Sequence, residues 1–379
     1  MNICIISNKY PNKYEPNVLV FLQQLVWQFA DLGHKCYVIC PMAANLHPEY
    51  LKLEKISVEK SFKDNNVVVY RPKYFSLGQT TIAGFNPAKF SVSSFTKCAL
   101  STIRKHDIPI DLLYSHFITP AGIATARIGK KLNKPVYIAH GEATLMTIED
   151  FGGPKAVAKE LESISGIIAV SAHNKNMLVE NHVVGSEKIR IFPNGYNPTR
   201  FYVMDKKAAR KKLGFPSDKF IVGFVGSYDE RKGILRVQQA VDQLDEVVFA
   251  CAGKGTLIPS SEKCIFKDAV NNSDLVTFYN ACDIFALPTR MEGCCNAIVE
   301  AVACGLPVIS SDRLFNYDVL DDTNSILIDP DDVVALKNAI NKLKQDNALR
   351  EKLHKGSINK SMELTLENRA QNILSYMIN

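Results

Sequence analysis

The stretch Asp283–Ser311, DIFALPTRMEGCCNAIVEAVACGLPVISS, decides the fold of this chain. It opens with an apolar run of strand length, Asp283–Leu287, and after a short loop it becomes an alanine-rich segment of helical period from Ala297 onward. The residues Cys304-Gly305-Leu306-Pro307 end this helix, and Val308–Ser311 is the next strand. Strand, loop, helix and strand in this order are typical of a parallel sheet covered by helices.

The same alternation runs through the rest of the chain. In the first half we expect strands at Asn2–Ser7, Cys36–Pro41, Asp111–Ser115, Val136–Ala139 and Gly166–Val170, and a helix at Val18–Leu32 that ends at Gly33. In the second half we expect strands at Phe220–Val225 and Val247–Ala252 and helices at Gly233–Leu244 and Asp274–Ala281. Turn-forming residues cluster at Phe192–Pro198, between the two halves. The pattern predicts two doubly wound α/β domains.

Length and composition agree with two globular domains. With 379 residues, 46% of them hydrophobic, the chain is too long for one ordinary core. No run approaches the roughly 18 apolar residues of a spanning helix, and Met1–Ser7 lacks the charged start of a signal peptide. The cysteines show no CxxC pair, and six lie in apolar patterns typical of reduced core thiols: Cys4, Cys36, Cys40, Cys251, Cys282 and Cys304. We therefore expect a cytoplasmic protein.

The net charge of +6 is carried in local basic runs. One run contains Lys130, Lys131 and Lys134, and another contains Lys206, Lys207, Arg210, Lys211 and Lys212. We interpret both as solvated helix faces, with an anionic partner as the alternative. No nucleic-acid partner is expected.

The loop that follows Leu287 has the features of a diphosphate site. A helix that begins just after Gly293 leaves backbone N–H groups without partners, and the helix dipole favours an anion there. We expect Asn296 to cap this helix, and Glu300 lies about one turn into it, within reach of a ribose beyond the phosphates. Glu292 can face a sugar carried by the diphosphate. The alternative, two solvent-facing glutamates, fits poorly with a position between an apolar strand and a packed helix.

The segment Glu292–Pro307 resembles the nucleotide-sugar motif of the family 4 retaining glycosyltransferases. These enzymes have the GT-B fold, two Rossmann-like domains around a cleft. The resemblance implies that Glu292 contacts donor-sugar hydroxyls, that Glu300 holds the ribose, and that Gly293, Cys294, Cys295 and Asn296 line the donor site. It also implies an acceptor-binding domain at 1–193, a nucleotide-sugar-binding domain at 194–360, and a segment 361–379 whose helix, Leu364–Met377, crosses back to the first domain.

A second loop, Phe224–Gly233, resembles the family loop that supplies an arginine and a lysine to the donor diphosphate. Lys232 matches the lysine. Ser227 stands at the usual arginine position, which removes one bidentate phosphate contact, and Arg231 is the candidate to replace it.

Two further residues of the first domain enter the predicted site. His140 ends the strand Val136–Ala139 where the family carries a histidine beside the sugar and the acceptor, so we group it with Glu292 and Lys232 as catalytic. A purely structural hydrogen-bonding role is the alternative. Asn17 stands where a glycine is common near the donor phosphates, and asparagine both tolerates a positive φ and caps helices.

We expect the reaction to need no metal and no other cofactor. The chain has one DxD match, Asp329-Pro330-Asp331, which fits the N-cap and first turn of a helix at Val333–Leu343. The charge of the leaving diphosphate then falls to Lys232 and to the helix amides. In the family, the acceptor hydroxyl attacks from the front face with retention of configuration, and Glu292 would position the sugar.

The acceptor is less well defined. The resemblance implies a UDP-sugar donor and a saccharide or lipid-linked saccharide acceptor in surface polysaccharide synthesis. The segment Lys89–Lys105 carries Phe90, Phe95, Leu100 and Ile103 among basic residues, and it fits either an ordinary amphipathic helix or a contact with the anionic inner face of the cell membrane. Two other functions stay open: a nucleotide-sugar epimerase of the same fold, and a sugar-nucleotide-binding protein without turnover.

Overall fold

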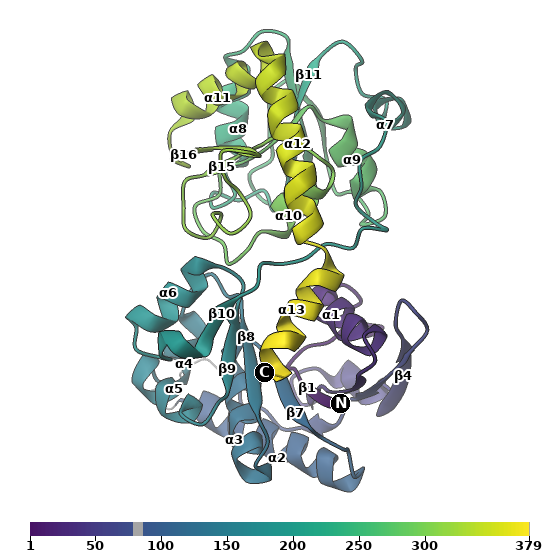
Figure 1. Cartoon of the computed structure of the whole chain (residues 1–379), viewed down its shortest axis with the longest axis vertical. Coiled ribbons are helices and arrows are strands. Elements are labelled where there is room, and N and C mark those ends of the chain that lie inside the picture. The colour runs from purple at the N-terminus through teal and green to yellow at the C-terminus, as the bar shows by residue number, and fades with distance from the viewer. Residues whose placement is uncertain (79–85, 379) are drawn as a thin grey trace. The chain divides into compact units, whose positions relative to one another are not determined.

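The computed structural model describes residues 1–78 and 86–378, which form two compact α/β units (Figure 1). The first unit comprises Met1–Phe192 and Ala370–Asn379, and the second comprises Pro193–Arg369. The chain leaves the first unit between Phe192 and Pro193, within the cluster of turn-forming residues. It returns to this unit within the last helix, α13 (Leu366–Ile378).

The first unit is built on an eight-stranded sheet with the order β10-β9-β8-β7-β1-β2-β5-β4. Strand β4 runs antiparallel to β5, and the other neighbours are parallel. The strands are β1 (Asn2–Ile6), β2 (Lys35–Ile39), β4 (Ile56–Lys60), β5 (Asn66–Tyr70), β7 (Leu112–His116), β8 (Val136–His140), β9 (Gly166–Ala169) and β10 (Ile189–Ile191), and β3 (Met42–Ala43) pairs separately with β6 (Lys73–Tyr74). All five strands predicted for this half are present.

Helices cover this sheet through apolar faces of helical spacing. They are α1 (Val20–Asp31), α2 (Ala88–Lys105), α3 (Ile123–Leu132), α4 (Met146–Phe151), α5 (Pro154–Leu161) and α6 (Ala172–Glu180), with the short turns η1 (Pro48–Lys52), η2 (Ile118–Gly122) and η3 (Ser186–Lys188). Helix α13 joins them, because Ala370, Ile373, Leu374 and Met377 are buried in the same core cluster as Ile3 of β1.

The second unit contains a six-stranded sheet with the order β13-β12-β11-β14-β15-β16, and all of its strand pairs are parallel. The strands are β11 (Phe220–Val225), β12 (Val247–Ala252), β13 (Cys264–Asp268), β14 (Ile284–Leu287), β15 (Val308–Ser311) and β16 (Ser325–Ile328). The helices are α7 (Lys206–Leu213), α8 (Ile234–Asp242), α9 (Leu275–Ala281), α10 (Asn296–Ala303), α11 (Val333–Gln345) and α12 (Asn347–Glu363). The predicted strands read as continuous apolar runs because helices bury both faces of a parallel sheet.

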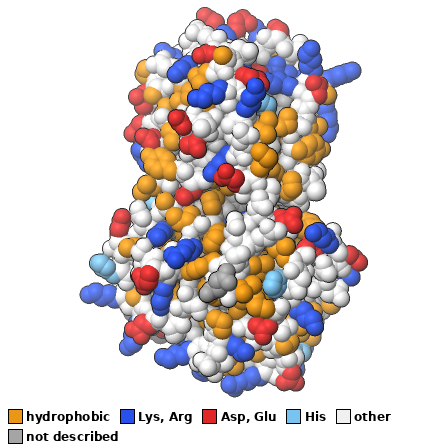
Figure 2. All heavy atoms as spheres, in the orientation of Figure 1, with side chains coloured by type: hydrophobic (Ala, Val, Ile, Leu, Met, Phe, Trp, Pro, Cys, Tyr) orange, Lys and Arg blue, Asp and Glu red, His pale blue; other side chains and the backbone are white. Residues whose placement is uncertain are grey.

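Surface charge follows the predicted pattern with one exception. Figure 2 shows basic and acidic side chains interspersed over the visible face of both units. The interpretation of the run Lys206–Lys212 as a solvated face is wrong for Arg210, which is buried. Its guanidinium donates to Asp283 Oδ2 at 2.6 Å, and the same oxygen accepts from the amide of Ile221 at 2.7 Å. This ion pair fixes the start of β14, the strand that leads into the predicted donor loop.

Three of the four apolar side chains considered for a membrane contact are packed inside the first unit. Phe95, Leu100 and Ile103 of α2 are buried in its core, and Phe90 is exposed. This favours the ordinary amphipathic helix. Among residues 1–78 and 86–378, no helix is both long and apolar enough to cross a membrane. All ten cysteines are free, and the six expected in the core are buried there.

Candidate functional site

Two loops of the second unit lie side by side because they leave the carboxyl ends of neighbouring strands, β11 and β14. Hydrogen bonds to backbone carbonyls are among the contacts that join them. The amide of Arg290 donates to the carbonyl of Arg231 at 2.9 Å, and the Arg231 guanidinium donates to the carbonyl of Met291 at 2.9 Å. The buried Arg236 donates to the carbonyl of Pro288 at 2.9 Å. The two loops therefore form one rigid polar surface.

Gly233 allows this close approach. Its φ is +82°, and a Cβ at this position would lie 2.8 Å from the carbonyl oxygen of Pro288. A side chain would therefore both strain the backbone and push the loops apart. Because Gly233 is the N-cap of α8, it also determines where the preceding residue, Lys232, points.

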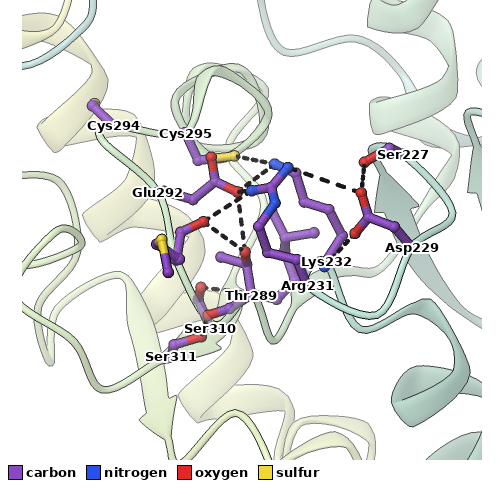
Figure 3. Close-up of polar contacts among 12 residues, drawn as sticks. Ser227, Asp229, Arg231, Lys232, Thr289, Glu292, Cys294, Cys295, Ser310 and Ser311 are labelled. Atoms are coloured by element: carbon purple, nitrogen blue, oxygen red, sulfur yellow. Dashed lines mark hydrogen bonds and ion pairs between the residues drawn. The ribbon is translucent and has the colours of Figure 1, made fainter. Parts of the chain in front are cut away.

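The carboxylate of Glu292 lies at the centre of this surface (Figure 3). Its Oε1 accepts from Lys232 Nζ at 2.7 Å, from Thr289 Oγ1 at 3.0 Å, and from the Arg231 guanidinium. Three residues of two separate loops therefore meet at one oxygen, and two of them are cations.

This cluster is partly withdrawn from water. The side chains of Lys232 and Glu292 are 11% and 13% exposed, whereas that of Arg231 is 41% exposed. Burial by itself would lower the pKa of Lys232, but the neighbouring Cys295 sulfur and Glu292 carboxylate outweigh it and raise this pKa. Lys232 therefore carries its charge at neutral pH.

Ser227 and Arg231 take different parts in the first loop. Ser227 Oγ donates to Asp229 Oδ2 at 2.5 Å, and Asp229 Oδ1 accepts from the amide of Lys232 at 2.8 Å, so Ser227 helps to hold the shape of the loop. The Arg231 guanidinium points toward Glu292, while its side chain stays partly exposed. A guanidinium is thus present at the site although Ser227 occupies the usual arginine position.

Helix α10 begins at the second loop. For the amides of Gly293, Cys294 and Cys295, no hydrogen-bond acceptor is present within residues 1–78 and 86–378. The prediction that Asn296 caps the helix is wrong: Cys295 is the N-cap, and Asn296 is the exposed first helical residue, which accepts from Asn194 Nδ2 at 2.8 Å. The loop turns into the helix one residue earlier than expected, and the start of α10 keeps free N–H donors.

The two cysteines of this loop are thiols with different neighbours. Cys295 Sγ lies 3.5 Å from Lys232 Nζ, and burial raises the pKa of this thiol despite the nearby ammonium. Cys294 Sγ accepts from the amide of Asn194 at 3.3 Å, and its carbonyl accepts from Asn194 Nδ2 at 3.0 Å. Asn194 therefore fixes this loop from the segment that follows Pro193.

Glu300 lies one turn into α10, as predicted, and the residue as a whole is half-buried. The buried phenol of Tyr279 donates to Glu300 Oε2 at 2.9 Å. Burial raises the pKa of Glu300 to about 7, although the hydrogen bond from Tyr279 and the charge of Arg200 act in the opposite direction.

This pKa predicts a pH-dependent stability. The folded protein keeps the Glu300 proton up to about pH 7, whereas an ordinary glutamate releases it near 4.5. The proton therefore stabilises the folded state at low pH, and this contribution is lost as the pH rises from 4.5 to 7. Relative to Glu300→Gln, which stays neutral, we expect the wild type to lose up to about 1.4 kcal/mol of unfolding free energy per pH unit in this window.

Urea denaturation of both proteins at several pH values measures this difference. Glu351→Gln, an exposed substitution on α12, is the matched control and should follow the wild type. If the difference in unfolding free energy between the wild type and Glu300→Gln stayed constant from pH 4.5 to 7, it would contradict the raised pKa of Glu300.

His140 lies in the first unit, at the end of β8, and its ring is fully buried. Neither ring nitrogen has a hydrogen-bond partner among the described residues, and Nδ1 lies 3.7 Å from Glu142 Oε2, which likewise has none. The other oxygen of Glu142 accepts from Thr147 Oγ1 at 2.9 Å. In this structure, His140 would contact a ligand only after the groups that cover it had moved.

Two predictions about local structure are wrong. Asn17 neither caps α1 nor has a positive φ: the N-cap is Leu19, with φ 46°, and Asn17 is an exposed turn residue. The N-cap of α11 is Asp332, whose carboxylate accepts from the amide of Ala335, not a residue of the DxD match. Asp331 of that match pairs with Arg290 at 2.7 Å instead.

Sequence reasoning missed several residues that shape the site. Thr289, Asp229 and Tyr279 fix Glu292, Lys232 and Glu300, respectively. Thr289 lies two residues after the end of β14, a position that could have been noticed. The contact of Tyr279 with Glu300 is tertiary. Within the described residues, no group of three or more His, Cys, Asp or Glu side chains is placed to hold a metal ion.

Comparison with known proteins gives the family of the chain. The model of the glycosyl transferases group 1 matches residues 205–360, and the model of glycosyltransferase family 4 matches residues 18–200. A Bacillus subtilis protein named as a teichuronic acid biosynthesis glycosyltransferase is 27% identical over 359 residues, which cover 91% of this chain and 90% of that protein.

Solved structures show the same fold. Sucrose-phosphate synthase from Thermosynechococcus elongatus superposes with a TM-score of 0.73 at 18% identity, over 99% of this chain and 97% of the other. HepE from Anabaena, solved in complex with UDP, gives a TM-score of 0.73 at 15% identity, over 99% of each chain. Taken together with the two units and their parallel sheets, these matches show that the chain belongs to the group 1, family 4 glycosyltransferases of GT-B fold.

Proposed function

We propose that this glycosyltransferase is a retaining, metal-independent enzyme that moves a sugar from a UDP-sugar to a saccharide or lipid-linked saccharide acceptor. The observation that carries the proposal is the cluster of Glu292, Lys232 and Arg231 beside the free amides that begin α10. Two cations and several N–H donors are what a diphosphate needs, and a carboxylate is what sugar hydroxyls need. HepE, which was solved with UDP, supports the choice of nucleotide.

Donor binding would rearrange the charges of the free protein. Without donor, Glu292 neutralises Lys232 and Arg231. The diphosphate carries more charge than one carboxylate and can also accept from the amides of Gly293, Cys294 and Cys295, so it would take over both cations. Glu292 would then be free to accept hydrogen bonds from the sugar, and the proposed role of Glu300 is to accept from the ribose.

The chemical step follows from this arrangement. As the bond from the anomeric carbon to the phosphate oxygen breaks, negative charge develops on the diphosphate, where Lys232 and Arg231 stabilise it. The acceptor hydroxyl attacks from the same face and forms the new glycosidic bond, and its proton passes to the leaving phosphate oxygen. Glu292 positions the sugar, and no covalent bond to the enzyme is formed. His140 keeps its proposed place beside the sugar, as the family resemblance implies.

A screen of nucleotide sugars by thermal shift tests the donor. A compound that binds the folded protein raises its melting temperature, and at equal concentration a tighter ligand raises it more, so the true donor should give the largest rise. Incubation with and without candidate acceptors then separates the possible functions. Transfer with retained anomeric configuration supports the proposal, conversion of the donor without acceptor indicates an epimerase, and binding without turnover indicates a binding protein.

Removal of divalent metal ions tests the proposal that the enzyme is metal-independent. Because Lys232, Arg231 and the helix amides supply the positive charge, we expect full transfer activity in EDTA and no gain from added Mg²⁺. Initial rates with the identified donor and acceptor measure this. A strict requirement for Mg²⁺ would show that the protein cations do not suffice.

The cellular role is proposed from the relatives. The Bacillus subtilis relative is named for teichuronic acid biosynthesis and a Staphylococcus aureus relative for capsular polysaccharide biosynthesis, so we place this enzyme in surface polysaccharide synthesis in the cytoplasm. Contact with the inner face of the membrane, if the acceptor is lipid-linked, would be electrostatic, since exposed Lys97, Arg104 and Lys105 remain on α2 while its apolar face is buried.

A further inference from the structure

A basic cavity lies in the first unit, on a part of the chain that has no role in the proposed donor chemistry. Its volume is about 600 Å³, and its wall comes from the start of β4, the segment that joins β5 to β6, and one face of α2. Four lysines line it: Lys55, Lys73, Lys97 and Lys105. Among the described residues that line the cavity, none is an aspartate or glutamate.

These four lysines carry positive charge into the cavity without a neutralising partner from the described residues. None of them forms an ion pair or a side-chain hydrogen bond with a described residue, whereas Lys9, Lys206 and Lys219 each pair with a carboxylate within 3 Å. Positive charges that converge without counter-charge repel one another. An anion in the cavity would relieve this repulsion.

Lys73 supports an anion in the cavity more strongly than the exposed lysines do. Its ammonium nitrogen is buried and has no hydrogen-bond partner among residues 1–78 and 86–378. Burial lowers the pKa of Lys73, and the charges of Arg71 and Lys55 lower it further. A buried ammonium without hydrogen bonds is costly and therefore rare unless a ligand completes its surroundings.

The remainder of the wall limits the class of ligand. Ser94 and Ser101, two helical turns apart on α2, add hydroxyl donors, and Tyr70 and Tyr74 add flat aromatic surfaces. Lysine ammonium groups and hydroxyls together suit the oxygens of a phosphate. The volume lies in the range of small-molecule sites and exceeds what a bare phosphate fills, so the phosphate would be part of a larger molecule.

We propose that this cavity binds the phosphate group of a second ligand, separate from the donor nucleotide. It shares no residue with the donor site, so the inference can fail independently of the proposed donor chemistry. The phosphate is carried either by a soluble phosphate ester or by a phospholipid headgroup, and the test distinguishes these two sources. The phospholipid arm rests on the membrane contact proposed for Lys97 and Lys105 and gives that contact a binding site.

Two variants and one control test the proposal. Lys97→Ser/Lys105→Ser removes two exposed charges of the rim, and Lys73→Met removes the buried charge while keeping the length of the side chain. Lys155→Ser/Lys159→Ser removes two exposed charges from α5, away from the cavity, and is the matched control. Lys73→Met should raise the melting temperature of the ligand-free protein, because a buried unpaired charge is lost.

Binding of glucose 6-phosphate is measured by calorimetry, and binding to phosphatidylglycerol vesicles by sedimentation, with phosphatidylcholine vesicles as reference. We expect at least one of the two probes to bind the wild type and the control equally, and to bind both cavity variants about tenfold more weakly. The probe that shows this pattern identifies the source of the phosphate. The proposal would be overturned if all four proteins bound the probes equally, or if the control lost as much affinity as the cavity variants. It would also be overturned if neither probe bound the wild type. UDP binding, measured in the same proteins, should not change.

Discussion

Replacing Glu292 by glutamine should lower the transfer rate by about 100- to 1000-fold while UDP binds at least as tightly as before. In the free protein this carboxylate occupies Lys232 and Arg231, the two cations that the diphosphate needs. Its removal eliminates competition for them, so affinity for UDP should rise as turnover is lost. Steady-state rates and calorimetric titration with UDP measure the two effects.

The unfolding free energy of the variant tests the contacts of Glu292 with Lys232 and Arg231 independently of the transfer rate. Without the carboxylate, Lys232 is a buried and unpaired charge, so we expect the unfolding free energy of free Glu292→Gln to fall by about 1–3 kcal/mol. Saturating UDP should restore most of this loss and give a larger thermal shift than in the wild type. Glu246→Gln, which breaks a surface ion pair of the same unit, is the control and should change neither rate nor UDP affinity. An unchanged transfer rate in Glu292→Gln would exclude Glu292 from the reaction.

Replacing Lys232 by methionine should weaken UDP binding by about 100-fold and reduce transfer by about 1000-fold. Methionine keeps an apolar stem of similar length, so the packing of this buried side chain is largely preserved, whereas the charge toward the leaving group is lost. Lys219→Met removes a lysine from a surface ion pair with Glu246 and serves as the control. Near-normal transfer by Lys232→Met would show that Arg231 and the helix amides suffice.

The double variant Glu292→Gln/Lys232→Met separates stability from catalysis. Because both partners of the buried pair are then absent, it should be more stable than Glu292→Gln alone. Transfer should remain as low as in the worse single variant, since the two residues act on the same step. Urea denaturation and rate measurements on the wild type, the two single variants and the double variant form a double-mutant cycle. Additive losses of stability would mean that the two side chains do not interact in the free protein.

Prediction from the sequence was most accurate where one contiguous segment contains all the residues that define the local structure. Residues 283–311 correctly predict β14, the following helix, and the next strand, because an apolar strand, a helix start and a Gly-Pro stop follow one another directly. Several strands were not predicted, and β4 and β13 show one reason. Ile56–Lys60 alternates partly and fully exposed residues at the edge of its sheet, and Cys264–Asp268 is only partly buried, so neither shows the continuous apolar run of a central strand.

Caps and loop conformations were predicted less well. Asn296, Asn17 and the DxD aspartates are all good capping residues by type, yet Cys295, Leu19 and Asp332 are the N-caps. A cap is chosen by where the chain turns into the helix, and one residue more or less in the loop changes which side chain stands there. Tertiary contacts decided this: Asn194 holds Cys294 and Asn296 in place, and Arg290 draws Asp331 away from the helix start.

By itself, the sequence determined the fold class and pointed to the two loops of the proposed donor site, because strand and helix periods and short motifs are local properties of the chain. Only the tertiary structure decided how these residues meet. Arg231 and Glu292 are 61 residues apart, and they pair because β11 and β14 are neighbours in the sheet. The same holds for the four lysines of the basic cavity, which come from three elements and were not grouped by any motif. Charge that is distributed along a chain acquires a function only when folding brings it together and removes water from it.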